Sequence, residues 1–325
     1  MTRILAVATA VLMTACGVDR ADTFRKGVPQ AKDVAVNVPS SSGQALSSRQ
    51  DGLEGERAGF YTLTRGVTVV INAGTVAVLG LVKAIVNNPP TSVRENTAVW
   101  GPHTDALSPN TYKFTVIKNA ENDYSYTLEG KGKNAGDDAY VVILSGAHKV
   151  AADAAGNPQE NYGNGTFLLD WDAAATLPEH GKEIGSAEFT YSRLSASADI
   201  RIDVEFKQVK DEETGSRVDA SYRYLSTPAA GGSFDFKIIK NLDNDPAKPA
   251  LEVATIRSRW TQQGAGRADV KAVGGDIPSG GATASECWDE NFASRYVNAS
   301  FAPSLNYGVE SVCAFATAEY SSLSL

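Results

Sequence analysis

The residue types that most often perform catalysis are sparse in this 325-residue sequence. It holds three histidines, His103, His148 and His180, and no two of them have the i, i+4 spacing of a metal-binding helix. No nucleophile-elbow, phosphate-loop or dinucleotide-binding motif accompanies them. We interpret all three histidines as surface residues and expect no bound metal.

Short acidic clusters are the second group of residues that could do chemistry. Asp289 and Glu290 are paired carboxylates, but adjacent residues on a strand point to opposite faces and would not converge on a substrate. The oxygen-rich segments 119–123 and 243–245 lack the full ligand set of a calcium-binding loop, so we interpret both as turns. The sequence therefore predicts no catalytic, cofactor-binding or metal-binding residue, no cofactor and no enzyme activity.

The N-terminus resembles the signal of a bacterial lipoprotein. Arg3 supplies a positive charge, the stretch from Ile4 to Met13 is apolar, and Cys16 follows a small residue. In that family the signal peptide is cleaved before the cysteine, which then carries diacylglycerol and acyl chains such as palmitate. Gly17 and Val18 resemble an outer-membrane address. The resemblance implies a cell-envelope protein anchored by lipid at Cys16, and the alternative is an ordinary secretory signal with an incidental cysteine.

The net charge of the chain limits the classes of partner that we expect. The chain has 30 basic and 38 acidic side chains, and cleavage of the signal removes Arg3, which leaves a net charge of −9. Nucleic acid is not expected as a partner, because binding it requires clustered Lys and Arg. Electrostatic attachment to anionic lipid is not expected either. We expect contact with the bilayer through acylated Cys16, an apolar ligand or an envelope protein as partner, and a monomeric chain.

Only two cysteines follow the predicted anchor, Cys287 and Cys313. In an exported and oxidising compartment such a pair favours a disulfide. Closing this loop would stabilise the fold by roughly 3 kcal/mol in the chain-entropy model. The alternative is a metal site, but two cysteines without nearby histidines lack the ligand count that zinc requires.

One long helix is predicted over about 61–87, and its residues 67–86 are mostly apolar. Twenty such residues are long enough to cross a bilayer, so a second membrane anchor is an alternative to a buried helix. We favour a helix surrounded by protein, with one polar stripe that is open or faces a ligand. The stripe comprises Thr68, Asn72, Thr75 and Lys83.

After the helix the hydrophobic period changes to two, which predicts strands. Ten segments fit this period: 112–116, 124–128, 140–145, 165–170, 187–192, 199–209, 217–225, 233–240, 251–261 and 267–273. The predicted fold is mainly β, a strongly curved antiparallel meander or incomplete barrel of about ten strands wrapped on one long apolar helix. The sequence predicts three regions: a lipoprotein signal peptide over 1–15, a lipidated tether over 16–59 containing a strand at 33–38, and a single β-rich domain with a C-terminal disulfide loop over 60–325.

Several short motifs resemble a family of uncharacterised bacterial outer-membrane lipoproteins. The motifs are IRSRW at 256–260, GAGRADV at 264–270, SECWDENF at 285–292, CAF at 313–315 and VWGP at 99–102. The resemblance implies one domain that contains the cysteine pair, and it implies no particular reaction.

Two functions are open from the sequence. The first is a structural or interaction module of the cell envelope without catalytic activity, whose helix simply fills the sheet. The alternative is a binding or carrier module with an apolar ligand between helix and sheet. A cavity of several hundred cubic ångströms at that place would favour the carrier.

Overall fold

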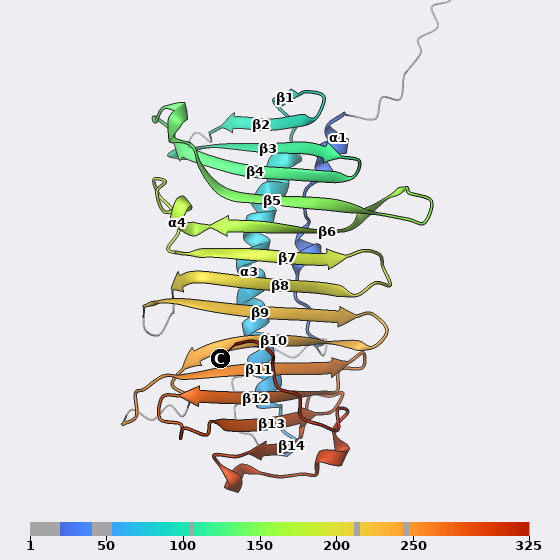
Figure 1. Cartoon of the computed structure of the whole chain (residues 1–325), viewed down its shortest axis with the longest axis vertical. Coiled ribbons are helices and arrows are strands. Elements are labelled where there is room, and N and C mark those ends of the chain that lie inside the picture. Colours follow the sequence, from blue (N-terminus) through green and yellow to red (C-terminus); the bar gives the residue numbers. More distant parts are fainter. Residues whose placement is uncertain (1–19, 41–53, 105–106, 211–214, 243–246, 325) are drawn as a thin grey trace, which may run out of the picture.

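The chain folds around one large open sheet. The computed structural model describes residues 20–40, 54–104, 107–210, 215–242 and 247–324, with no side chain described at residues 20, 70 and 73–78. Fourteen antiparallel strands each pair with their neighbours in sequence, from β1 to β14 (Figure 1). At a spacing of about 4.8 Å, thirteen steps make the sheet roughly 60 Å long across its strands.

The strand bounds follow the chain order. They are β1 Ser92–Val93, β2 Thr97–His103, β3 Asn110–Ala120, β4 Asp123–Gly132, β5 Val141–Ala152, β6 Pro158–Asp170, β7 Ser186–Arg193, β8 Ile200–Lys210, β9 Arg217–Thr227, β10 Gly231–Lys240, β11 Glu252–Thr261, β12 Gly266–Gly274, β13 Ala282–Trp288 and β14 Ser294–Ala299. Short helical turns lie at α4 Trp171–Ala174, η1 Asp137–Ala139, η2 Pro303–Leu305 and η3 Glu310–Val312.

Alternation along the strands places apolar side chains on one face, here called the inner face. In β8, Ile202 and Val204 are at most 1% exposed, while the intervening positions carry charges. Tyr224 of β9 lies directly opposite Ile202 and is equally buried. Cross-strand contacts of this kind stabilise a sheet, and the stacked rings of Phe167 and Phe189 provide another. The opposite face is called the outer face.

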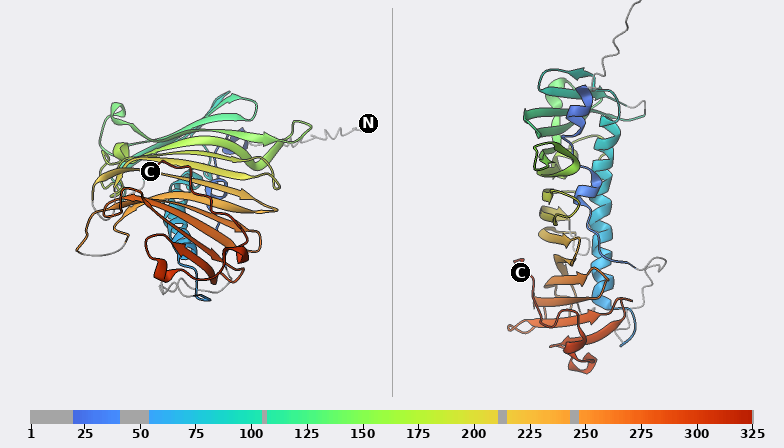
Figure 2. Two further views of the ribbon diagram at one scale, coloured as in Figure 1. Left: turned by 60° about the horizontal axis from the view of Figure 1, so that its bottom comes forward. Right: turned by 90° about the vertical axis from the view of Figure 1, so that its right-hand side faces the viewer.

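Helix α3, Gly59–Val86, crosses the strands on the inner face (Figure 2). It begins beside β13 and ends near β2, where the indole nitrogen of Trp100 donates to the carbonyl of Asn88 at 2.8 Å. Its 28 residues span about 42 Å. Contact with the sheet includes a 2.6 Å hydrogen bond between the hydroxyls of Thr64 and Ser258. The helix therefore runs across the strands on one face of the sheet, and one of its sides remains uncovered.

The N-terminal segment, defined as residues 20–40, covers more of the inner face. It contains α1, Arg20–Arg25, and α2, Ala31–Val34, which lie on the same side of the sheet as α3 (Figure 2). Phe24 and Val34 are at most 3% exposed within the core. The predicted tether is therefore wrong for residues 20–40, and the strand predicted at 33–38 begins in a helix instead. The apolar residues of this segment are spaced between polar ones, and they pack on the sheet.

The predicted fold class is wrong in its strand number, its curvature and its helix. There are fourteen strands rather than about ten, and β1 and β14 do not pair, so the sheet is open. α3 occupies the predicted helical stretch, but the sheet does not wrap it, and Val69 and Leu81 are 51% and 44% exposed. The physical reason is that the N-terminal segment shares the inner face with α3, so the sheet need not curl to bury its apolar side chains. Among the described residues, no helix is both long enough and apolar enough to cross a membrane.

Several outward-facing backbone groups at the two edges of the sheet have partners. Val297 of β14 exchanges two backbone hydrogen bonds with Tyr307, and the amide of Ala299 donates to the side chain of Asn306. At the other edge, the hydroxyl of Thr91 accepts from the amide of Gly101 at 2.7 Å and donates to its carbonyl. Such caps hinder pairing of the edges with a second chain.

Candidate functional site

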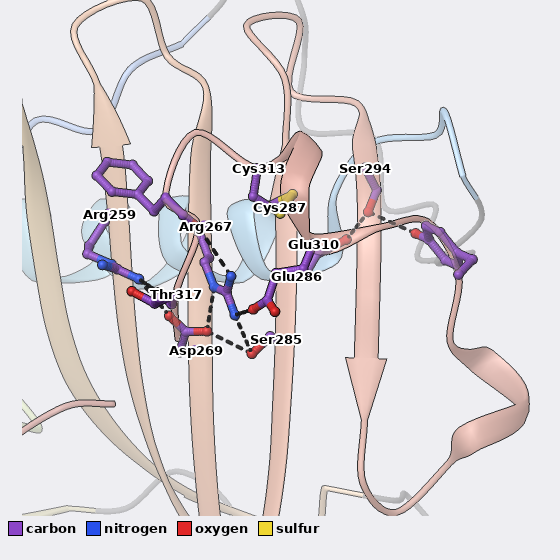
Figure 3. Close-up of a disulfide and its surroundings, with 12 residues drawn as sticks. Arg259, Arg267, Asp269, Ser285, Glu286, Cys287, Ser294, Glu310, Cys313 and Thr317 are labelled. Atoms are coloured by element: carbon purple, nitrogen blue, oxygen red, sulfur yellow. Dashed lines mark hydrogen bonds and ion pairs between the residues drawn. A yellow bond between two sulfur atoms is a disulfide. The ribbon is translucent and has the colours of Figure 1, made fainter. Parts of the chain in front are cut away.

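The most elaborate polar arrangement is on the outer face of β9 to β13, beneath the end of the chain. Residues 310–322, here called the C-terminal strap, run back across these strands (Figures 1 and 3). The strap is linked to β13 by Cys313 and reaches β9, where Arg223 donates to the hydroxyl of Ser322 at 3.1 Å. Strands β11 to β13 are consequently buried on both faces over much of their length.

Asp269 is the centre of a buried ionic cluster below the strap (Figure 3). Its carboxylate is fully buried and accepts from Arg267 at 2.8 Å, from Arg259 at 3.0 Å and from the hydroxyl of Ser285 at 2.7 Å. The three partners come from β11, β12 and β13, which the antiparallel register brings side by side. A charge buried this deeply is tolerated only when paired and hydrogen-bonded, as this one is.

The strap is held through its backbone. Arg267 donates to the carbonyl of Phe315 at 3.1 Å, and Arg259 donates to that of Thr317 at 2.8 Å. In return, the amide of Glu319 donates to Asp269 at 3.0 Å. Carboxylates of the strap, Glu310 and Glu319, pair with the same two arginines at 2.7 Å each. The cluster thus binds the backbone of the C-terminal strap and also neutralises the strap's two carboxylates.

The predicted disulfide is present. Cys287 of β13 and Cys313 of the strap are bonded, with Cα atoms 5.7 Å apart. Both side chains are buried and pack with Tyr296. The bond therefore fixes the start of the strap next to the ionic cluster.

Removal of the disulfide should loosen the strap. For the double variant Cys287→Ala with Cys313→Ala we expect the free energy of unfolding to fall by about 3 kcal/mol, because the unfolded chain is no longer constrained. Urea denaturation measures this change. Reduction of the wild type should reproduce it, and the intact mass of the untreated protein should be two hydrogens below that of the reduced form. Two freely alkylated thiols in the untreated protein would contradict the assignment.

Glu286 occupies the inner face of β13 at the N-terminus of α3. Its carboxylate accepts from the amides of Gly59 and Phe60 at 3.0 and 2.6 Å and from the hydroxyl of Ser294 at 2.7 Å. Residue Ala58, at the N-cap, has no side chain that could do this. Burial raises the pKa of Glu286, while these donors oppose the rise. Glu286 therefore caps α3 and stabilises the positive end of the helix dipole, although it comes from a strand far away in the sequence.

A buried hydrogen-bonded chain lies on the inner face of β4 to β7. Nδ1 of His148 is 2.7 Å from the hydroxyl of Tyr191, and the hydroxyl of Tyr126 donates to the carbonyl of Thr166 at 3.4 Å. Gly163 gives the imidazole its space, since a Cβ at that glycine would be 2.6 Å from the ring. Burial lowers the pKa of His148 to about 4. The surface location predicted for this histidine is wrong, whereas His103 and His180 are exposed as predicted.

His148 should make stability depend on acidity. Since its pKa in the folded protein is below the ordinary value of 6.5, its contribution is complete above about pH 6.5 and is lost as the pH falls toward 4. At about 1.4 kcal/mol per unit, the loss is of the order of 3 kcal/mol. We expect His148→Gln, which cannot gain this charge, to lose less stability between neutral and acidic pH in urea denaturation. Parallel profiles for the two proteins would contradict this assignment.

The four residues of the predicted polar stripe have different environments. Thr68 is buried and donates to the carbonyl of Arg65, whereas Lys83 is exposed. The side-chain amide of Asn72 binds both backbone groups of Val36, at 2.9 and 2.8 Å, and so holds the N-terminal segment on α3. The side chain of Thr75 and the whole of Cys16 lie outside what the structure describes.

Of the acidic clusters considered from the sequence, two lie among the described residues. Asp289 forms an ion pair with Arg295 at 2.7 Å, and residues 119–123 contain the turn between β3 and β4. Residues 243–245 lie outside the described ranges. Within those ranges, no group of three His, Cys, Asp or Glu side chains is arranged to bind a metal.

Two surface hollows of about 320 and 330 Å³ lie beside polar side chains. The first is lined by residues of β4 to β7, including His148 and Tyr191, and the second by residues around Trp288 and Asp289. Neither is lined by a described residue of α3. No family model, curated protein or solved structure matches this chain.

The buried cluster was not predicted from the sequence, although a signal for it exists. Arg257 and Arg259 share one face of a strand, and Arg267 and Asp269 share the same face of the next. Alternation with a period of two would, by itself, assign the face that carries these charges to solvent. The concentration of arginines beside the cysteine pair, within the motifs quoted above, is the feature that could have indicated a covered one.

Proposed function

We propose that the protein is a lipid-anchored interaction module of the cell envelope, attached to the outer membrane through acylated Cys16 and without catalytic activity. The lipoprotein-like signal and the resemblance to uncharacterised outer-membrane lipoproteins support the anchor. The observation that carries the interaction role is the division of the sheet into a face that is covered and a face that is largely free.

The outer face of β3 to β9 offers an extended polar surface. Opposite charges face one another across strands, as in the pair of Asp203 and Arg223 at 2.7 Å and the pair of Lys113 and Glu129 at 3.0 Å. Beyond β9 the C-terminal strap covers the same face. Capped backbone groups hinder strand addition by a second copy at the edges, and the proposal places a different protein on this outer face. The carrier alternative would place its ligand between helix and sheet, and neither hollow described above is lined by a described residue of α3.

Lipid attachment is the directly testable part of this proposal. Cells fed radioactive palmitate should label the wild-type protein and should not label Cys16→Ser, because the variant lacks the thiol that accepts the lipid. The wild type should sediment with the membrane fraction and the variant should be released. Equal labelling of both proteins would refute the anchor.

A further inference from the structure

Helix α3 has one side whose described residues are exposed and mostly apolar. Five described residues of the helix are exposed: Val69, Gly80, Leu81, Lys83 and Ala84. At 100° per residue they lie within about 160° of the helix circumference. The helix contains no acidic residue, and its two charged side chains, Arg65 and Lys83, are basic.

Charge is segregated between the two layers of the molecule. The N-terminal segment and α3, residues 20–40 and 59–86, contain six basic and two acidic side chains, a net charge of +4. Residues 87–325, which contain all fourteen strands, have a net charge of −11. The overall negative charge therefore conceals a basic layer, and that layer contains the exposed apolar residues of α3.

The length of chain before α1 limits where the anchor can be. Between Cys16 and Arg20 there are four Cα–Cα steps, so these atoms can be at most about 15 Å apart. α1 is fixed at this point, because Ala21 and Phe24 are buried and Nε of Arg25 donates to the carbonyl of Val86 at 2.8 Å. The attachment point is therefore limited to about 15 Å from Arg20, the first residue of α1, and α1 lies on the helix-bearing side of the sheet beside the C-terminal end of α3.

We propose that the layer formed by the N-terminal segment and α3 rests on the surface of the anionic bilayer to which Cys16 is attached. This inference rests on the proposed lipid anchor and adds the orientation of the molecule. Val69 and Leu81 enter the interfacial region, and the ammonium group of Lys83 remains among the headgroups. The opposite face, with the C-terminal strap, points away from the membrane, where a partner can reach it.

Two cysteine variants of the lipidated full-length protein test this orientation. Leu81→Cys places a thiol on the exposed side of α3, and Leu168→Cys places one on the outer face of β6. Leu168 is the matched control for Leu81, since the two side chains are 38% and 44% exposed. The native thiols do not interfere, because Cys287 and Cys313 are bonded and the thiol of Cys16 is alkylated.

Each variant would carry an environment-sensitive fluorophore and be reconstituted in vesicles of phosphatidylethanolamine and phosphatidylglycerol containing chain-brominated lipid. We expect the fluorophore at position 81 to shift to the blue and lose intensity by bromine quenching, and the one at 168 to do neither. Equal emission at both positions in vesicle-bound protein would overturn the orientation while leaving the anchor intact. Loss of vesicle binding together with absence of lipid in the intact mass would refute the anchor itself, and with it this inference.

Discussion

Asp269→Ala is expected to destabilise the protein by about 3–5 kcal/mol, the usual cost of breaking a buried ion pair by removing one partner. The variant leaves the guanidinium groups of Arg259 and Arg267 beneath the C-terminal strap without the carboxylate they share. The hydroxyl of Ser285 and the amide of Glu319 lose their acceptor as well. Thermal denaturation should show a melting temperature lower by about 10 °C.

Asp203→Ala is the matched control for this change. Asp203 forms a 2.7 Å pair with Arg223 on the same outer face, but both side chains are in contact with solvent. An exposed pair contributes at most about 1 kcal/mol, so this variant should melt close to the wild type. Proteolysis gives a second readout, since only Asp269→Ala should release the strap from the strands. Similar melting temperatures for the two variants would contradict the role assigned to the buried cluster.

The sequence predicted the individual strands well because a sheet with one covered face has a clear period of two. All ten predicted segments lie at β3 to β12. β13 was missed because both of its faces are covered, so Ser285 and Cys287 are as buried as their inner-facing neighbours and the alternation disappears. β14, with only six residues, was missed as well. β2 was missed because it contains Gly101–Pro102, a sequence that usually interrupts strands.

Curvature and the covering of the inner face could not be predicted in the same way. The alternating pattern of β8 and β9 is identical for a closed barrel and an open sheet, since it specifies which side is buried and not what buries it. The polar residues of the N-terminal segment suggested a tether, yet Phe24, Val34 and Val36 are buried in the core on the inner face of the sheet. The sequence therefore predicted the local structure and the disulfide, but not the open architecture.

The buried ionic cluster could not be predicted for the same reason, because the sequence pattern does not show what covers a face of the sheet. Arg267 and Asp269 occupy outer positions, and a rule based on alternation assigns such positions to solvent. Only the return of the strap, fixed at Cys313, converts them into the most deeply buried charges of the sheet. Glu286 and His148 show the related effect on the inner face, where a polar residue is accepted because α3 or a tyrosine supplies its hydrogen bonds.

Val82→Asp is expected to unfold the protein. Val82 is fully buried on the side of α3 that packs into the core, where an aspartate would have no partner. Burial of an unpaired carboxylate costs several kcal/mol, which is comparable to the net stability of a whole domain. Circular dichroism and thermal melting should show that the cooperative unfolding transition of the protein is lost.

Leu81→Asp separates the two sides of the same helix. Leu81 is the preceding residue, yet it is 44% exposed, so its replacement should change the melting temperature of the protein in solution only slightly. In lipidated protein on vesicles the same variant should weaken contact of α3 with the bilayer, because an aspartate is repelled from an anionic interface. If Val82→Asp melted with the wild type, the packing of α3 on the sheet would be refuted. If instead Leu81→Asp abolished folding in solution, the exposed side of α3 would be part of the core, and both the open architecture and the proposed membrane contact would fail together.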